Sequence, residues 1–188
     1  MGRLVYGIMG VSLDGYVEDE SGGFDWSTPS DEVHRIANEH VRTASGLLFG
    51  RRMYEVIDEF WTAAAERDDL PATEAEFARV YVETPRIVFS DSLETVPDGV
   101  RLVRSADARA EIERLRQEPG GHLEIGGPGL ASSVVDLIDE FRIWLCPVVL
   151  GGGKPYWPAP PEQLDLRLAE NRTCDGGVLY LRYERAAG

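Results

Sequence analysis

The sequence predicts an α/β protein with a mixed, mostly parallel sheet of about eight strands. From Leu4 to Asp139, short apolar runs typical of strands alternate with segments of helical periodicity, which favours parallel strands whose connecting helices cover both faces of the sheet. The last third differs, because two segments of alternating polarity flank the turn signal Asp175-Gly-Gly177 and predict an antiparallel hairpin. With 188 residues and no long linker, the chain is expected to form one domain, residues 1–188.

The opening strand is expected from Leu4 to Val11, ahead of the turn dipeptide Asp14-Gly15. The first helix is expected to begin within Thr28-Pro29-Ser30-Asp31-Glu32, because Ser30 or Thr28 can cap it and acids follow in its first turn. The remaining elements follow from the same signals. Strands are expected at 46–49, 86–90, 100–104, 122–125, 141–149, 164–173 and 178–183, and helices at 51–61, 72–83, 106–118 and 128–139.

The charge balance excludes two classes of partner. Asp and Glu number 33 against 19 Lys and Arg, so the net charge is −14, and the pI is about 4.6. A chain this acidic and without a basic run offers no footprint for nucleic acid or for an anionic membrane surface. The longest apolar stretch contains Arg142 and Pro147, so no spanning helix is expected.

The two cysteines, Cys146 and Cys174, form no CxxC pair, and no secretory leader precedes the first apolar run. This usage predicts a protein of the reducing cytoplasm. His34, His40 and His122 lack the spacing of metal ligands, so no metal site is expected.

Three glycine-bearing loops are candidates for ligand binding, because helix N-termini at the carboxyl ends of strands present unpaired N–H groups to anions. In the first, Gly50 precedes Arg51 and Arg52. Two arginines at a helix N-terminus oppose the helix dipole, and an anionic ligand would reverse that cost. The alternative is a pair of solvated surface arginines that pair with Asp or Glu.

The second loop is Gly126-Gly127-Pro128-Gly129, which lets a backbone approach a ligand closely or forms an ordinary turn. The third loop, 151–157, holds Lys154, the single lysine of the chain, together with Tyr156 and Trp157. Lys154 is either a contact for a phosphate or carboxylate or a solvated loop residue.

Four segments together resemble the dihydrofolate reductase superfamily. Trp26-Ser-Thr-Pro29-Ser-Asp31 resembles its W-x-x-P-x-D/E segment, Phe49-Gly50-Arg51-Arg52-Met53-Tyr54-Glu55 its G-R-x-T-[WY]-E segment, Ile87-Val-Phe-Ser90 its strand ending in serine, and Ile125-Gly126-Gly127 its I-G-G turn. Ser12-Leu-Asp-Gly15 and Pro147-Val-Val-Leu-Gly151-Gly make the chain more similar to stand-alone relatives of the reductase domain of the riboflavin-biosynthesis deaminase/reductase. The motif of the zinc deaminase half, H-x-E followed by P-C-x-x-C, does not occur.

The resemblance implies a three-layer dihydrofolate reductase-like fold and a reduced nicotinamide cofactor, NADPH or else NADH, across the carboxyl edge of the sheet. It implies that Arg51 and Arg52, after Gly50, hold phosphates near the adenosine end and that Ser90 lies beside the 2′-phosphate. The pyrophosphate would face Gly126, Gly127, Pro128, Gly129 and Leu130, and the loop with Leu13, Asp14 and Gly15 would border the nicotinamide. Trp26, Lys154 and Trp157 are the candidate substrate contacts.

The implied reaction is hydride transfer to a C=N or C=O carbon of a small heterocyclic or ribityl-type substrate, the nearest named activity being 5-amino-6-(5-phosphoribosylamino)uracil reduction. Asp31 falls where dihydrofolate reductases keep the carboxylate that assists substrate protonation, and its alternative role is compensation of the helix dipole. Asp91, beside Ser90, would repel a 2′-phosphate, and Met53 replaces the usual threonine.

Two other functions stay open at this point. One is a reductase of pterins or dihydrofolate, although Thr84 stands where folate reductases place an arginine for the glutamate tail. The other is a non-catalytic, ligand-binding dimeric domain of the same fold. Stand-alone members of this kind are often homodimers, and the segments 141–149 and 156–157 are the candidate interfaces.

Overall fold

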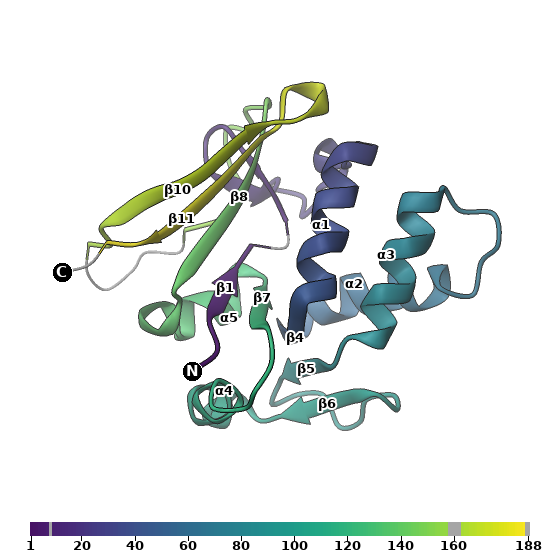
Figure 1. Ribbon diagram of the computed structural model, residues 1–188, viewed down its shortest axis with the longest axis vertical. Helices are drawn as coiled ribbons and strands as arrows, with labels where there is room; N and C mark the ends of the chain where they lie inside the picture. Colours follow the sequence, from purple (N-terminus) through teal and green to yellow (C-terminus); the bar gives the residue numbers. More distant parts are fainter. Residues whose placement is uncertain (8, 158–162, 187–188) are drawn as a thin grey trace.

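The computed structural model describes residues 1–7, 9–157 and 163–186, and its elements alternate as the sequence predicts (Figure 1). The strands are β1 (Leu4–Tyr6), β2 (Gly10–Ser12), β3 (Tyr16–Glu18), β4 (Ala44–Gly50), β5 (Arg86–Phe89), β6 (Val100–Val103), β7 (His122–Gly126), β8 (Glu140–Cys146), β9 (Lys154–Pro155), β10 (Leu166–Thr173) and β11 (Leu179–Arg185). The α-helices are α1 (Asp31–Thr43), α2 (Arg51–Ala64), α3 (Ala72–Glu83), α4 (Ala108–Leu115) and α5 (Pro128–Ser133). Short 3₁₀ turns are η1 (Asp25–Ser27), η2 (Ser105–Asp107), η3 (Val135–Leu137) and η4 (Asp175–Gly177).

The main sheet is mixed, as predicted. Across the described residues its strands lie in the order β10-β11-β8-β1-β7-β4-β5-β6, and β2 also pairs with β8. The pairs from β8 to β6 are parallel, whereas β10 with β11 and β11 with β8 are antiparallel. The predicted antiparallel C-terminal hairpin is therefore confirmed. A separate two-stranded sheet joins β3 to β9.

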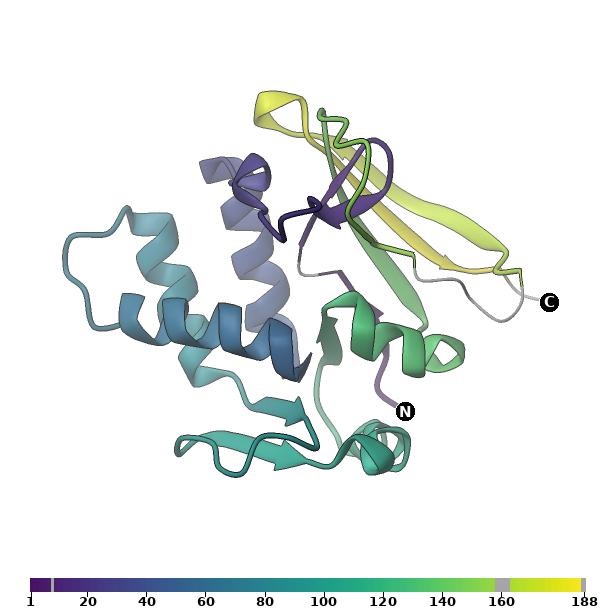
Figure 2. The ribbon, with the colours of Figure 1, turned by 180° about the vertical axis from the view of Figure 1, so that it is seen from behind.

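Alternation along β4 explains the three layers. Leu47 and Phe49 point toward α1, α2 and α3, where they pack with Val41, Phe77 and Tyr81. Leu48 points to the opposite face and belongs to the core that α4 and α5 cover. The three-layer dihydrofolate reductase-like architecture that the resemblance implies is thus present, with helices on both faces of the sheet (Figures 1 and 2).

Several elements end earlier than the sequence predicts. The predicted strand 4–11 is interrupted after Tyr6, because Gly7 has a positive φ and a Cβ there would lie 2.1 Å from the Arg142 carbonyl oxygen; residue 8 lies outside the described residues. The predicted helix 128–139 ends at Ser133, where Val134 leaves helical geometry, and continues only as the 3₁₀ turn η3. The strand expected at 141–149 ends at Cys146, before Pro147, which has no N–H for a sheet.

The two segments named as candidate dimer interfaces pack largely within the protomer, although Pro147 and Val149 are exposed. Strand β8 has neighbours on both edges, namely β11 on one side and β1 with β2 on the other. Tyr156 is fully buried, and Trp157 packs on Phe141 with ring centroids 4.9 Å apart. Strand β8 therefore offers no free edge, and the homodimer and its interface stay predictions. In the described part of the chain, no helix has the length and apolarity needed to cross a membrane.

Candidate functional site

Helices α2 and α5 begin side by side at the carboxyl ends of two neighbouring parallel strands (Figure 2). Gly50 is the N-cap of α2 and Gly127 is the N-cap of α5, with φ +97°. A Cβ on Gly50 would lie 3.9 Å from Leu130 Cβ, and one on Gly127 would lie 3.1 Å from Met53 Cβ. Gly127 therefore lets the two helix N-termini approach each other closely, whereas a Cβ at Gly50 would make only an ordinary contact.

This edge is suited to an anion. The first turn of α2 contains no acidic residue, and Gly50 has no side chain to cap it, so the first backbone N–H groups of the helix stay available. A Cβ on Gly129, in the first turn of α5, would meet no atom within 4 Å, which leaves open space there. Pro128 opens α5 and is buried, as is Leu130, so these two residues contribute packing.

The arginines that follow Gly50 are both exposed and both paired. Arg51 Nη1 lies 3.2 Å from Glu55 Oε1, one turn along α2. Arg52 Nη2 lies 2.6 Å from Glu18 Oε2 on β3. This pairing is what the surface-arginine alternative expects, and a ligand phosphate would have to compete with these carboxylates.

Asp14 connects the loop 13–15 to the glycine loop that begins at Gly151, two segments that the sequence analysis treats separately. Its carboxylate accepts hydrogen bonds from Ser12 Oγ (2.6 Å), the Leu150 amide (3.1 Å) and the Gly151 amide (2.7 Å). The Ser12 hydroxyl, followed by these amides, lowers the pKa of Asp14 below its usual value. Asp14 therefore fixes the 13–15 loop on the segment 147–151, with Leu13 exposed beside it.

Residues 153–157 bind the C-terminal end of the loop 13–15 and the strand β3 that follows it. The Tyr156 amide donates to the Gly15 carbonyl (2.8 Å), and β9 pairs with β3 so that Lys154 lies opposite Glu18, with Nζ 3.9 Å from Oε1. The ring of Tyr156 stacks on that of Tyr6, with centroids 4.5 Å apart. Lys154 is thus brought to the same carboxylate as Arg52, although 102 positions separate the two along the chain.

Asp31 and Trp26 lie near the start of α1. Ser30 caps the helix through its hydroxyl, as predicted. Asp31 is exposed, and its Oδ1 accepts a hydrogen bond from the hydroxyl of Thr73 on α3 (2.9 Å). Trp26 is half-buried and its Nε1 donates to the Gly23 carbonyl (3.3 Å). The contact to Thr73 joins α1 to α3. Asp31 also lies in the first turn of α1, the position from which an acid compensates the helix dipole, and its catalytic role stays a prediction.

Ser90 is buried at the end of β5, where its Oγ accepts the amides of Ser92 (3.2 Å) and Leu93 (3.1 Å). Asp91 beside it is exposed and accepts the Ser105 amide (3.0 Å). Hydrogen bonding to Ser105 lowers the pKa of Asp91, so a negative charge stands at this corner. The Ser90 oxygen shapes the turn by accepting these two amides, and burial of the side chain restricts the access of a 2′-phosphate to it.

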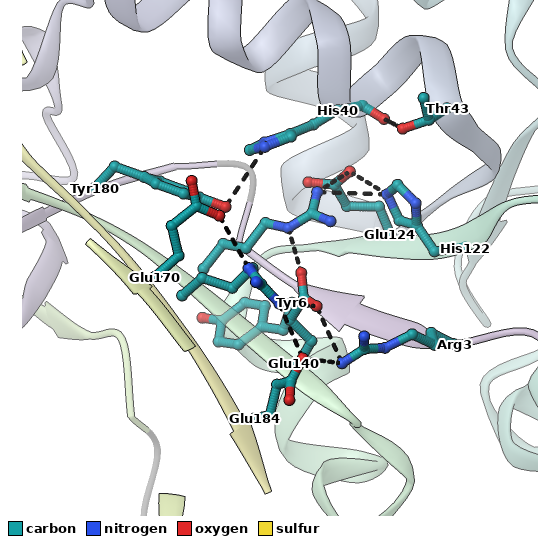
Figure 3. Close-up of polar contacts among 12 residues, drawn as sticks. Arg3, Tyr6, His40, Thr43, His122, Glu124, Glu140, Glu170, Tyr180 and Glu184 are labelled. Atoms are coloured by element: carbon teal, nitrogen blue, oxygen red, sulfur yellow. Dashed lines mark hydrogen bonds and ion pairs between the residues drawn. The ribbon is translucent and has the colours of Figure 1, made fainter. Parts of the chain in front are cut away.

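A buried ionic network between α1 and the sheet was not predicted (Figure 3). Arg142 on β8 lies between Glu124 on β7 (3.5 Å) and Glu140 (2.7 Å), and all three side chains are at least nine-tenths buried. His122 Nε2 lies 3.1 Å from Glu124 Oε2. Burial raises the pKa of Glu124, but the His122 contact and the Arg142 charge outweigh it, so the pKa stays below its usual value. These residues support the two strands that carry the site loops.

Comparison with known proteins agrees with this architecture. The family model of the RibD C-terminal domain matches residues 4–180. The Bacillus subtilis (strain 168) proteins YyaP and YwjB, both described as uncharacterized, are 26% and 29% identical to this chain, over 93% and 94% of it and 91% and 94% of their own lengths.

Three solved structures share the fold. A putative riboflavin biosynthesis protein from Shewanella sp. PV-4 superposes with a TM-score of 0.74 at 24% identity, over all of both chains. A Thermotoga maritima diaminohydroxyphosphoribosylaminopyrimidine deaminase/5-amino-6-(5-phosphoribosylamino)uracil reductase gives 0.70 at 16% identity, over 98% of this chain and 57% of that one. Enterococcus faecalis dihydrofolate reductase, complexed with NADP(H), gives 0.67 at 16% identity, over 99% and 98%.

Proposed function

The chain belongs to the family of the RibD C-terminal domain, and on this premise we propose that it is an NADPH-dependent reductase of a small heterocyclic or ribityl-type substrate. The nearest named activity is 5-amino-6-(5-phosphoribosylamino)uracil reduction, part of the name of the Thermotoga maritima neighbour. The observation that carries the proposal is the pair of uncapped helix N-termini at Gly50 and Gly127. Such a pair suits the pyrophosphate of a dinucleotide, and the Enterococcus faecalis neighbour binds NADP(H).

A bound nicotinamide would supply the hydride, and the protein would supply alignment and exclusion of water. The first turns of α2 and α5 would hold the pyrophosphate, and the 13–15 loop, fixed by Asp14, would border the ring. NADH is the second candidate cofactor, because the exposed Asp91 carboxylate would repel a 2′-phosphate and the Ser90 side chain is buried. Trp26, Lys154 and Trp157 would contact the substrate.

Cofactor binding is tested by titrating the protein with NADPH and NADH while following fluorescence of its four tryptophans. Quenching should saturate, and at a hundredfold excess over Kd the ligand should stabilise the fold by about 2.7 kcal/mol, which raises Tm by roughly 5–10 °C. The double variant Arg51→Ala/Arg52→Ala should bind more weakly, and Arg79→Ala, on the exposed side of α3, serves as the control. No quenching and no change in Tm at millimolar cofactor would refute the proposal.

Turnover separates this proposal from the two alternatives. Thr84 is buried and its hydroxyl donates to the Val80 carbonyl (2.7 Å), so this position offers no charge to the glutamate tail of a folate, and little dihydrofolate reduction is expected. Asp31→Asn should abolish turnover at unchanged cofactor Kd if Asp31 donates a proton to the substrate. Cofactor binding without any NADPH oxidation across candidate pyrimidines and pterins would instead favour the non-catalytic domain.

A further inference from the structure

Glu18 lies between two cations that come from different parts of the chain. Arg52, in the first turn of α2, and Lys154, on β9, both approach its carboxylate, one at each oxygen. The Glu18 side chain is only 17% exposed, whereas those of Arg52 and Lys154 are 60% and 36% exposed. The carboxylate is therefore held inside, while both cations remain within reach of a ligand from solvent.

The backbone around Glu18 is shaped for this arrangement. A Cβ on Gly153 would lie 1.9 Å from the Glu18 carbonyl oxygen, and one on Gly22 would lie 2.9 Å from Arg52 Nη2. Both glycines have positive φ, so a side chain at either position would be strained, and one at residue 153 would also collide with the Glu18 backbone. Glycines thus allow the loop 18–23 to fold closely over Arg52.

The nearby charges favour a phosphate at this place. Without Glu18, Arg52 and Lys154 would lose their shared counter-charge beside the positive end of the α2 dipole, and the first turn of α2 contains no acid. In the protein as it stands, the Glu18 carboxylate pairs with both Arg52 and Lys154. We propose that Glu18 is the resident anion of a phosphate-binding site made by Arg52, Lys154 and the first turn of α2, and that a phosphate-bearing ligand displaces it.

Magnitudes make this exchange feasible. The Arg52–Glu18 ion pair is weakened by solvent on its arginine side, because the Arg52 side chain is 60% exposed. A phosphate forms charge-assisted hydrogen bonds roughly twice as strong as neutral ones, and it also gains the helix N-terminus. The ligand therefore replaces a weak internal contact by stronger ones, and the released carboxylate frees the loop 18–23. Because the Trp26 indole donates to the Gly23 carbonyl, this release is visible in tryptophan fluorescence.

The inference rests on the proposed function only in taking a cofactor phosphate as the ligand, so inorganic pyrophosphate is the first probe. Calorimetry should give wild-type protein a weak Kd, Glu18→Gln a Kd about fivefold lower, and Lys154→Gln a higher one. Glu20→Gln is the matched control, since the described residues give Glu20 no ion pair, and its Kd should equal that of wild type. Amide exchange of residues 18–23 should speed up when pyrophosphate binds to wild-type protein.

The same variants are then titrated with NADPH. Tighter NADPH binding by Glu18→Gln supports both proposals. If Glu18→Gln binds pyrophosphate more tightly but no variant binds NADPH, the proposed cofactor is refuted and the role of Glu18 as resident anion is supported. Equal or weaker pyrophosphate binding by Glu18→Gln, or amide exchange in the loop that pyrophosphate leaves unchanged, overturns the inference.

Discussion

Replacing Arg142 by Met should destabilise the fold by about 3–5 kcal/mol, because it leaves buried carboxylates without their counter-ion. Glu124 would keep only His122, and Glu140 would keep the outer arginines Arg3 and Arg182 at 3.1 and 3.4 Å. For a chain of this length, such a loss corresponds to a Tm lower by roughly 6–20 °C. Urea unfolding followed by circular dichroism measures the free energy, and calorimetry measures Tm.

Two comparisons test the reasoning behind that figure. Arg167→Met removes an exposed arginine that pairs with Glu184 at 2.6 Å, and it should cost less than about 1 kcal/mol. The double variant Glu124→Gln/Arg142→Met should be more stable than Arg142→Met alone, since a neutral amide needs no counter-ion. A cost below about 1 kcal/mol for Arg142→Met, or a double variant less stable than the single one, contradicts a buried charge cluster.

Three further predictions concern the site loops and pH. Asp14→Asn should accelerate amide exchange at 150–151, whereas Asp19→Asn, whose carboxylate bonds only within its own loop, should not; equal effects would remove the special role of Asp14. Burial, and next the Arg142 charge, lowers the pKa of His40 from 6.5 to about 4. Between pH 6.5 and 4.5 the unfolded chain therefore binds more protons than the folded one, and the free energy of unfolding should fall by about 2 kcal/mol as the pH is lowered. The same pH dependence of stability in His40→Gln would mean that another group causes it. Gly153→Ala should lower the free energy of unfolding in urea by at least about 2 kcal/mol, against about 1 kcal/mol for Gly151→Ala, where a Cβ meets no atom within 4 Å. Similar losses for the two variants would mean that the close contact between residue 153 and the Glu18 carbonyl oxygen can relax.

Local signals explain which elements the sequence could predict. Helix α3 begins and ends where its pattern predicts, and Ser30 caps α1, because these features depend on neighbouring residues. The prediction of one helix over 128–139 was wrong in its length. Leu130, Val134 and Ile138 have the spacing of one face of a helix, and all three are buried. Their burial is real, yet the chain leaves helical geometry at Val134, and an apolar pattern cannot distinguish one helix from a helix followed by a 3₁₀ turn.

In the candidate site, too, the local features were predictable from the sequence and the long-range contacts were not. Its glycine loops are recognisable because a strand, a glycine and a helix start follow one another in the sequence. The contacts that organise the site join distant positions: 34 residues separate Glu18 from Arg52, and 137 separate Asp14 from Gly151. With 33 acidic residues available, the sequence alone could not select which of them meets Arg52. The buried Glu124–Arg142 pair has the same origin, since it depends on strand register between β7, β1 and β8.

These pairings change which groups are expected to attract an anion in a protein of net charge −14. Arg51, Arg52 and Lys154 each face a carboxylate, so their charges are largely compensated before a ligand arrives. The backbone N–H groups in the first turns after Gly50 and Gly127 are not compensated in this way, because no side chain caps either helix. The overall negative field is screened over about 8 Å at physiological salt. On the proposed function, the attraction for an anion would therefore come mainly from the helix N-termini, and the cations would adjust its strength through the carboxylates with which they pair.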